Sequence, residues 1–190
     1  MPRLHTVVAS NRPGSNGRPL GDWFTRQAIA HGSFEAGVVD LAEVALPFLD
    51  EPEHPSTGRY VHQHTKDWSA TITAADALVW VMPMYNGGFN AVLKNAIDYL
   101  YAEWRDKPVA LFSYSGGPTG GAPAAAMLKP VLTRLGMRVT EATIALPRVD
   151  SLITADGGFL PPEDLAGPVT AVLDELAALV AASAEPVPTA

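Results

Sequence analysis

The chain has 190 residues and no cysteine, and its 13 basic and 20 acidic side chains give a net charge of −7 with histidine neutral. This length fits one domain with a core of its own, and the missing cysteines exclude disulfides and thiolate-bound metals. The acidic balance argues against a nucleic-acid partner, and the lack of a signal-peptide pattern or of a run of about 18 apolar residues predicts a cytoplasmic protein that does not enter a membrane.

The first predicted strand, residues 4–9, leads into a polar loop, and a helix follows from about Pro19. We call residues 10–18 the first loop, with the sequence Ser10-Asn11-Arg12-Pro13-Gly14-Ser15-Asn16-Gly17-Arg18. Free N–H groups at the positive end of a helix favour an anion. Two hydroxyls and a guanidinium suit a terminal monophosphate, and the loop offers Ser10, Ser15 and Arg12. It lacks the dinucleotide and nucleoside triphosphatase fingerprints, and a solvated surface loop is the alternative.

A second strand is predicted at an edge of the sheet over residues 34–41. A connection over residues 42–60 follows, rich in proline, glutamate and histidine, and then a helix over residues 60–74. A connection of that length rarely lacks a purpose. We therefore expect its apolar start, Leu46-Pro47-Phe48-Leu49, to pack near a pocket or a subunit contact.

Three histidines, His54, His62 and His64, accompany Glu51 and Glu53 in this region. His62 and His64 are two positions apart, so on a helix they would point to different sides and could not share an ion. No H-E-x-x-H motif is present. We predict no metal site and interpret these residues as solvated histidines on a helix.

Residues 77–100 combine a strand, a loop and a helix. Residues 77–82 are an uncharged apolar run, typical of a strand buried on both faces. The strand is predicted to break at Pro83, and the second loop, residues 83–88, leads to a helix capped by Asn90. One face of this helix is apolar, through Leu93, Ala96, Ile97 and Leu100. Ligands of parallel α/β sheets bind where such loops leave the strands, although a tight turn around a half-buried tyrosine is an alternative.

This stretch resembles the P-x-Y-N…LKNAID signature of the NADPH-dependent FMN reductase family, which includes quinone and azo-dye reductases. The matching residues are Pro83-Met84-Tyr85-Asn86 and Leu93-Lys94-Asn95-Ala96-Ile97-Asp98. The resemblance covers residues 4–146, and the Ser-x-Arg-x-x-Ser spacing of the first loop matches the family's phosphate loop. Members often carry Glu where this chain has Met84, and Pro where it has Phe89-Asn90.

The fourth predicted strand, residues 109–114, runs into a glycine-rich segment and then a helix over residues 123–135. This third loop, residues 115–121, reads Ser115-Gly116-Gly117-Pro118-Thr119-Gly120-Gly121. Its glycines allow backbone N–H groups to approach the polar edge of a ligand. In the resembled family a loop at this place contacts the flavin ring, whereas a flexible loop without a ligand is the alternative. No G-x-S-x-G elbow is present, so no serine hydrolase is predicted.

The last predicted elements are an edge strand over residues 138–146 and a helix over residues 163–182, separated by a loop of mixed character. The helix carries an apolar stripe that suits a core or a subunit contact. We predict one domain over residues 1–183 and a disordered tail over residues 184–190.

Five strands alternating with five helices predict a three-layer α/β fold. The resemblance implies a flavodoxin-like five-stranded parallel sheet of order 2-1-3-4-5 with helices on both faces. The three loops follow the first, third and fourth strands. These strands are neighbours in that order, so the loops should converge on one pocket.

The resemblance implies an FMN-dependent NAD(P)H oxidoreductase with ping-pong kinetics. NADPH or NADH would give a hydride to FMN, and a quinone, flavin or azo acceptor would then take two electrons. It further implies a homodimer or dimer of dimers, with contacts near Trp68 and residues 93–101. The aromatic residues in or after these helices suit such a contact, although core packing explains them almost as well: Trp68, Tyr99, Tyr101 and Trp104. The alternative is a non-catalytic FMN-binding electron carrier or regulatory module of the same fold.

No catalytic side chain is expected, because the flavin carries the chemistry. N–H groups of Asn86 and Gly87 would face the N5 edge of the flavin, those of Gly116 and Gly117 its pyrimidine edge, and Tyr85 would shape the nicotinamide side. The implied cofactor-binding residues are Ser10, Arg12, Ser15, Asn16, Gly17, Pro83, Met84, Tyr85, Asn86, Gly87, Ser115, Gly116 and Gly117.

Overall fold

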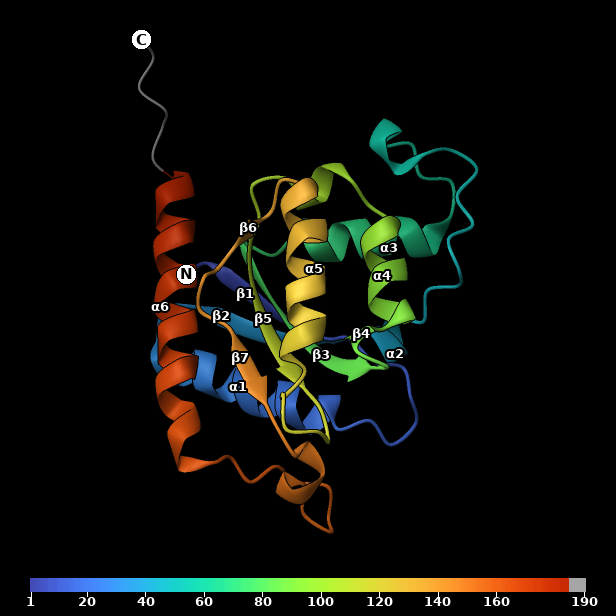
Figure 1. Ribbon diagram of the computed structural model, residues 1–190. Helices are drawn as coiled ribbons and strands as arrows, with labels where there is room; N and C mark the ends of the chain where they lie inside the picture. Colours follow the sequence, from blue (N-terminus) through green and yellow to red (C-terminus); the bar gives the residue numbers. More distant parts are fainter. Residues whose placement is uncertain (185–190) are drawn as a thin grey trace.

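A largely parallel β-sheet forms the middle layer of the molecule in the computed structural model, which describes residues 1–184 (Figure 1). The strand order is β2-β1-β3-β5-β6, with β7 also pairing β5 and β4 pairing β3 in the antiparallel sense. The strands are β1 (Arg3–Val8), β2 (Glu35–Asp40), β3 (Ala77–Tyr85), β4 (Gly88–Phe89), β5 (Pro108–Tyr114), β6 (Arg138–Val139) and β7 (Ile144–Leu146). The predicted α/β class and parallel order are confirmed.

The described residues form seven strands, where five were predicted. The single strand expected over residues 138–146 is interrupted because the backbone N–H groups of Glu141 and Ala142 donate to the carboxylate of Glu175 at 2.7 and 2.9 Å, not to a neighbouring strand. The predicted break at Pro83 was also wrong. Pro83 stays in β3 in register with Tyr114, and the strand continues into a hairpin with β4.

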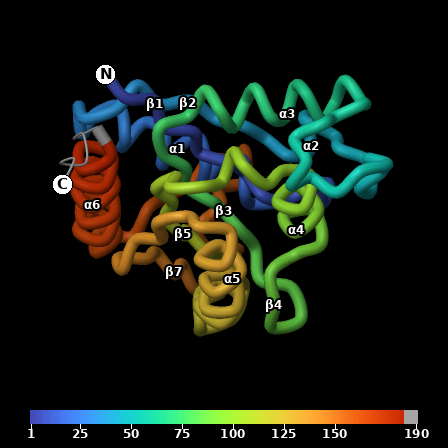
Figure 2. Tube along the Cα trace, turned by 90° about the horizontal axis from the view of Figure 1, so that it is seen from above, coloured from blue at the N-terminus to red at the C-terminus, as the bar shows by residue number. Residues whose placement is uncertain are grey.

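Helices cover both faces of the sheet. They are α1 (Gly17–His31), α2 (Leu41–Val44), α3 (Gln63–Thr73), α4 (Ala91–Asp98), α5 (Ala122–Arg134) and α6 (Ala166–Ala184). Helices α1 and α6 share one apolar cluster with the sheet, and α3, α4 and α5 share the other. In Figure 2, α6 accordingly lies on the far side of the molecule from α3 and α4. Residues 185–190, which belong to the tail predicted to be disordered, lie outside the described residues.

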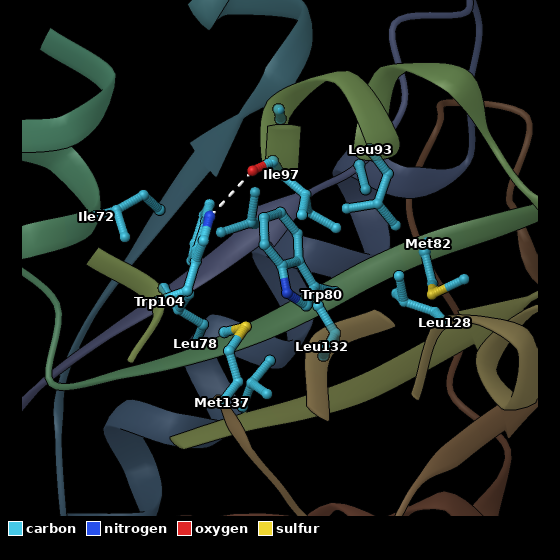
Figure 3. Packing of buried hydrophobic residues seen from close by; sticks show 14 of the residues in the cluster. Ile72, Leu78, Trp80, Met82, Leu93, Ile97, Trp104, Leu128, Leu132 and Met137 are labelled. Atoms are coloured by element: carbon cyan, nitrogen blue, oxygen red, sulfur yellow. Dashed lines mark hydrogen bonds between the residues drawn. The ribbon is translucent and has the colours of Figure 1, made fainter. Parts of the chain in front are cut away.

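Strand β3 is buried on both faces, as its uncharged sequence predicted. Leu78, Trp80 and Met82 belong to the cluster under α3, α4 and α5, whereas Val79 and Val81 belong to the cluster under α1 and α6. Figure 3 shows Trp80 beside a second tryptophan of this core, Trp104, whose Nε1 donates to the carbonyl of Ile97 at 3.0 Å. Parallel strands with helices on both sides need this composition, because neither face meets water.

Three of the four aromatic residues expected near a subunit contact are part of this core. Trp68, Tyr99 and Trp104 are buried within the single chain, and the indole N–H of Trp68 donates to the carbonyl of Ala96 at 2.8 Å. Tyr101 alone is exposed, with 40% of its surface accessible. Their number is therefore explained by packing inside one chain.

One helical segment, Glu163–Ser183, is long and apolar enough to cross a membrane by length and composition. It covers η4 (Glu163–Leu165) and α6 as far as Ser183, and five of its apolar side chains are buried in the cluster beneath α1: Leu165, Val169, Val172, Leu173 and Leu176. The apolar stripe thus contributes to the core, which is one of the two roles that the sequence predicted for it.

Helix α1 lies unusually close to the sheet through two glycines one turn apart. A Cβ atom on Gly21 would be 2.5 Å from Val8 Cγ2. A Cβ atom on Gly17 would be 2.9 Å from Val8 Cγ1 and 2.8 Å from the hydroxyl of Tyr114. Only glycine permits this approach, which fixes where the N-terminus of α1 stands above the sheet.

We expect Gly21→Ala to lower the free energy of unfolding by about 1–3 kcal/mol, because the added methyl group overpacks the contact with Val8. Gly167→Ala is the matched control, since a Cβ atom there meets nothing within 4 Å and Gly167 also lies in a helix. Urea unfolding of both variants measures the difference. Equal stability of the two would contradict the close packing of α1.

Candidate functional site

The three loops singled out in the sequence meet at the carboxyl ends of β1, β3 and β5. The arrows of β3 and β5 run toward the same edge of the sheet in Figure 1. Side chains tie the loops together across long separations in the sequence. The predicted convergence of the loops is therefore present in the structure.

Each serine of the first loop is held by a tyrosine from a different strand. The hydroxyl of Ser10 lies 3.2 Å from that of Tyr85 at the end of β3, and the hydroxyl of Ser15 lies 3.1 Å from that of Tyr114 at the end of β5. Burial raises the pKa of Tyr114, so its hydroxyl keeps its proton at neutral pH. The sequence analysis did not identify Tyr114, because 99 residues separate it from Ser15.

The first loop also closes on itself. The backbone N–H groups of Arg12 and Gly17 donate to the hydroxyls of Ser10 and Ser15 at 3.4 and 3.1 Å, and the N–H of Ser15 donates to the carbonyl of Arg12 at 3.0 Å. Gly17 was predicted to bind a ligand directly. Its N–H already has a partner, and the residue is buried, so its visible role is to let α1 approach the sheet.

Arg12 and Arg18 differ in their partners although both belong to the first loop. Arg18 donates to Glu43 at 2.6 Å and to Asp22 at 3.1 Å. Within residues 1–184, no ion pair engages the exposed Arg12. The first turn of α1 contains no acidic residue. A guanidinium near an uncompensated helix N-terminus is a site for an anion.

The second loop is a tight β-hairpin. Met84 pairs with Phe89 and Tyr85 with Gly88, which leaves Asn86 and Gly87 as the two turn residues. Both have positive φ, 51° and 84°, as a type I′ turn requires. The Asn-Gly pair is itself a strong hairpin signal that the sequence analysis did not use. Asn86 and Gly87 are exposed at the tip, Met84 is half-buried, and Pro83 is buried inside the strand.

Asn90 joins the end of this hairpin to α4 and to β1. Its Oδ1 accepts from the N–H of Leu93 at 2.8 Å, which confirms the predicted cap. Its Nδ2 donates to the carbonyl of Ala9 at the end of β1. One buried side chain thus sets the start of α4 relative to the first loop.

The third loop is attached to the segment that follows β7. The N–H groups of Arg148 and Val149 donate to the carbonyls of Gly117 and Ser115 at 3.2 and 3.1 Å, and the N–H of Ser115 donates to the carbonyl of Leu146 at 3.2 Å. This segment contains the 3₁₀ turn η3 (Val149–Leu152). The sequence analysis described it only as a loop of mixed character, so its contribution to the site was missed.

The side chain of Asp150 in η3 reaches the first loop. Its Oδ1 accepts from Nδ2 of Asn16 at 2.8 Å. The structure thus brings a carboxylate to the site where sequence reasoning expected only hydroxyls, N–H groups and a guanidinium. Nothing in the local sequence signals this contact, because 134 residues separate the partners.

A cavity of about 520 Å³ lies beside the first loop, between α2, its following connection and α4. Apolar and amide side chains line it, from Asn11, Leu41, Ala42, Ala45, Leu46, Pro47, Phe48, Ala91, Val92, Asn95 and Ala96. Leu46, Pro47 and Phe48 of the long connection line this cavity, and the expected contact of that segment with the ligand pocket or with another subunit stays a prediction. None of the described residues that line the cavity is charged.

The rings of His62 and His64 stack, with centroids 5.2 Å apart and an interplanar angle of 9°. The prediction that they point to different sides of a helix was wrong, because His62 is the extended residue before α3 and not part of it. His64 contacts Asp50 at 3.0 Å. No cluster of three or more metal-binding side chains occurs among the residues that the structure describes.

Residues 2–150 match the family described as NADPH-dependent FMN reductase. An NAD(P)H-dependent FMN reductase of Schizosaccharomyces pombe is 38% identical over 151 residues, which cover 77% of this chain and 74% of that protein. An FMN-dependent NADPH-azoreductase of Staphylococcus aureus is 31% identical over 159 residues, 83% of this chain and 79% of that protein.

Among solved structures, a flavoenzyme NAD(P)H:(acceptor) oxidoreductase from Paracoccus denitrificans superposes with a TM-score of 0.75. The alignment covers 96% of this chain and 98% of that protein at 22% sequence identity. At 22% identity this structural similarity supports the fold alone. The two relatives named above support membership of the family.

We expect Asn90→Ala to lower the free energy of unfolding by about 2 kcal/mol or more, because it removes a helix cap and leaves the carbonyl of Ala9 without a partner. Asn90→Ser should lose roughly half as much, since a serine hydroxyl can still cap α4. Urea unfolding compares the variants. If both are as stable as the parent protein, Asn90 does not anchor α4.

Proposed function

The chain belongs to the NADPH-dependent FMN reductase family, and on that premise we propose that its three loops together hold FMN. The chain is an FMN-dependent NAD(P)H oxidoreductase. When bound, FMN would supply the redox chemistry, which is hydride transfer from NADPH or NADH followed by transfer of two electrons to an acceptor. The observation that carries the proposed site is the pairing of Ser10 with Tyr85 and of Ser15 with Tyr114.

The first loop suits the phosphate end of FMN. Ser10 and Ser15 are oriented by their tyrosines and can donate, Arg12 supplies a positive charge, and the N-terminus of α1 adds its dipole. Asn16 and Gly17 close the loop against α1. The phosphate is the most negative part of FMN, so this set gives the cofactor its orientation.

The second and third loops suit the ring end. The hairpin tip exposes the backbone of Asn86 and Gly87, and Gly116 and Gly117 offer backbone without side chains that would block a planar ring. Ser115 adds a hydroxyl, Pro83 lies in β3 beside Tyr114, and Met84 pairs with Phe89 at the base of the hairpin. We propose that the ring of Tyr85 forms a wall on the reductant side while its hydroxyl holds Ser10. These side chains bind, orient and exclude water, and none acts as an acid or base.

We propose quinones, free flavins or azo compounds as acceptors. The azo class is supported by the name of the Staphylococcus aureus relative, an FMN-dependent NADPH-azoreductase. Met84, which stands where family members often have Glu, leaves this part of the site uncharged and suits neutral aromatic acceptors. We also propose a cytoplasmic location and no nucleic-acid or membrane partner, supported by the net charge of −7 and the absence of cysteine.

We expect anaerobic stopped-flow mixing of the FMN-loaded protein with NADPH or NADH to bleach the flavin absorbance within seconds. An acceptor added next should restore it, and initial rates at several concentrations of both substrates should give the parallel lines of ping-pong kinetics. Colour that persists with both nicotinamides would favour a non-catalytic electron carrier or regulatory module. Neither relative named above is described as one of these.

We expect Arg12→Ala to weaken FMN binding about tenfold or more, because a hydrogen bond to a charged group contributes about 1.5–3 kcal/mol and 1.4 kcal/mol is tenfold in affinity. Riboflavin, which lacks the phosphate, should bind the variant and the parent equally. Fluorescence titration with both flavins measures this. Arg18→Ala is the matched control, because Arg18 is already paired with carboxylates. Equal losses for the two flavins would show that Arg12 does not bind the phosphate.

We propose that the protein forms a homodimer, or a dimer of dimers, through the face that carries α4. The exposed side chain of Phe48 supports this dimer, whereas the buried aromatic residues of the core do not. Phe48 is 84% exposed and stands at the rim of the uncharged cavity beside α4, so a two-fold axis could place each Phe48 in the cavity of the other copy. Exposed aromatic side chains are enriched at such contacts.

We expect light scattering of the FMN-bound protein at micromolar concentration to give at least twice the mass of one chain, and Phe48→Asp to reduce it to one chain. Leu160→Asp is the control, because Leu160 is also an exposed apolar residue, with 61% of its surface accessible, and does not line the cavity. A single-chain mass for the unmodified protein would reject the dimer.

A further inference from the structure

The side chain of Asn16 does not cap α1, although Asn16 stands at the N-cap position of this helix. Its Nδ2 donates instead to Oδ1 of Asp150 at 2.8 Å. An Asn at an N-cap normally stabilises the helix through such a bond. Here that interaction is replaced by a link from the first loop to η3.

Asp150 also lies against the backbone of the third loop. Its turn starts at Arg148, which has a positive φ of 51° and donates to the carbonyl of Gly117. A Cβ atom on Gly116 would lie 2.7 Å from Oδ2 of Asp150. The carboxylate therefore rests on the backbone of the third loop while its other oxygen is bonded to the first loop.

The charge of Asp150 is unfavourable for the phosphate that the first loop is built to hold. Among the residues that the structure describes, Asn16 alone donates a hydrogen bond to this carboxylate. A carboxylate can only accept hydrogen bonds, and it has capacity for several. Asp150 is exposed, so its free acceptor positions face solvent beside both loops, where a donor on the ligand can reach them.

We propose that Asp150 accepts a hydrogen bond from a hydroxyl of the FMN ribityl chain and so selects flavins in which that chain is intact. The inference rests on the proposed function, in which the first loop holds the phosphate and the third loop the ring. The ribityl chain joins these two parts of FMN and carries three hydroxyl donors. Asp150 touches both loops, and its Oδ2 has no donor among the described residues.

The test is a titration of the parent protein and of Asp150→Ala with FMN and with an FMN analogue whose ribityl hydroxyls are replaced by hydrogen. Asp150→Ala should weaken FMN about tenfold and leave the affinity for the deoxy analogue almost unchanged. Asp150→Asn keeps a neutral oxygen and should lose less. Equal losses of FMN and analogue would show that Asp150 only braces the loops and would overturn the proposal.

Asn16→Ala is the matched control, because it breaks the same link between the loops and keeps the carboxylate. It should preserve the preference for FMN over the deoxy analogue, and loss of that preference would overturn the proposal. Thermal unfolding without flavin checks that each variant folds. Binding of inorganic phosphate, used as a separate probe, should not weaken in Asp150→Ala. If the parent protein binds FMN and the deoxy analogue equally, the proposed role of Asp150 is wrong and the proposed function stands. If it binds neither FMN nor phosphate, the proposed function is wrong as well.

Discussion

The direct contact of α1 with strand β1 sets the geometry on which the rest of the site depends. Gly17 and Gly21 have no side chains, so the helix lies against Val8, and its N-terminus is fixed close to the carboxyl ends of the strands. At that height the serines of the first loop come within hydrogen-bond distance of tyrosines from β3 and β5. A helix one methyl group farther from the sheet would lose this alignment. The close packing of α1 on Val8 thereby sets the hydrogen bonds between the serines of the first loop and their tyrosines.

Much of the architecture could be predicted because its determinants are local or periodic. The uncharged run in β3, the cap at Asn90 and the loops after three neighbouring strands are all visible in the sequence. Other features depend on residues far apart in the chain. Glu175 interrupts the last strand from a helix more than thirty residues away, and Asp150 and Tyr114 reach the first loop across still longer separations. The hairpin at Asn86-Gly87 had a local signal, the Asn-Gly pair, which the sequence analysis interpreted as part of a loop.

The links between loops also imply that the two ends of the proposed cofactor site are not independent. Tyr85 belongs to the hairpin but contacts Ser10, and Asp150 follows β7 but contacts Asn16 and the backbone at Gly116. A shift of the hairpin or of η3 would therefore be transmitted to the first loop. If the three loops hold FMN as proposed, such cross-links would supply the rigidity that positioning of a cofactor needs.

Glu175 has a consequence beyond the count of strands. An uninterrupted strand over residues 138–146 would present a long row of unpaired backbone groups at the border of the sheet, which is a template for pairing with another chain. By accepting the N–H groups of Glu141 and Ala142, the carboxylate divides this border into segments of two and three residues. Short, charged borders resist edge-to-edge association. One glutamate on α6 thus leaves fewer adjacent unpaired backbone groups at this border for another chain to pair with.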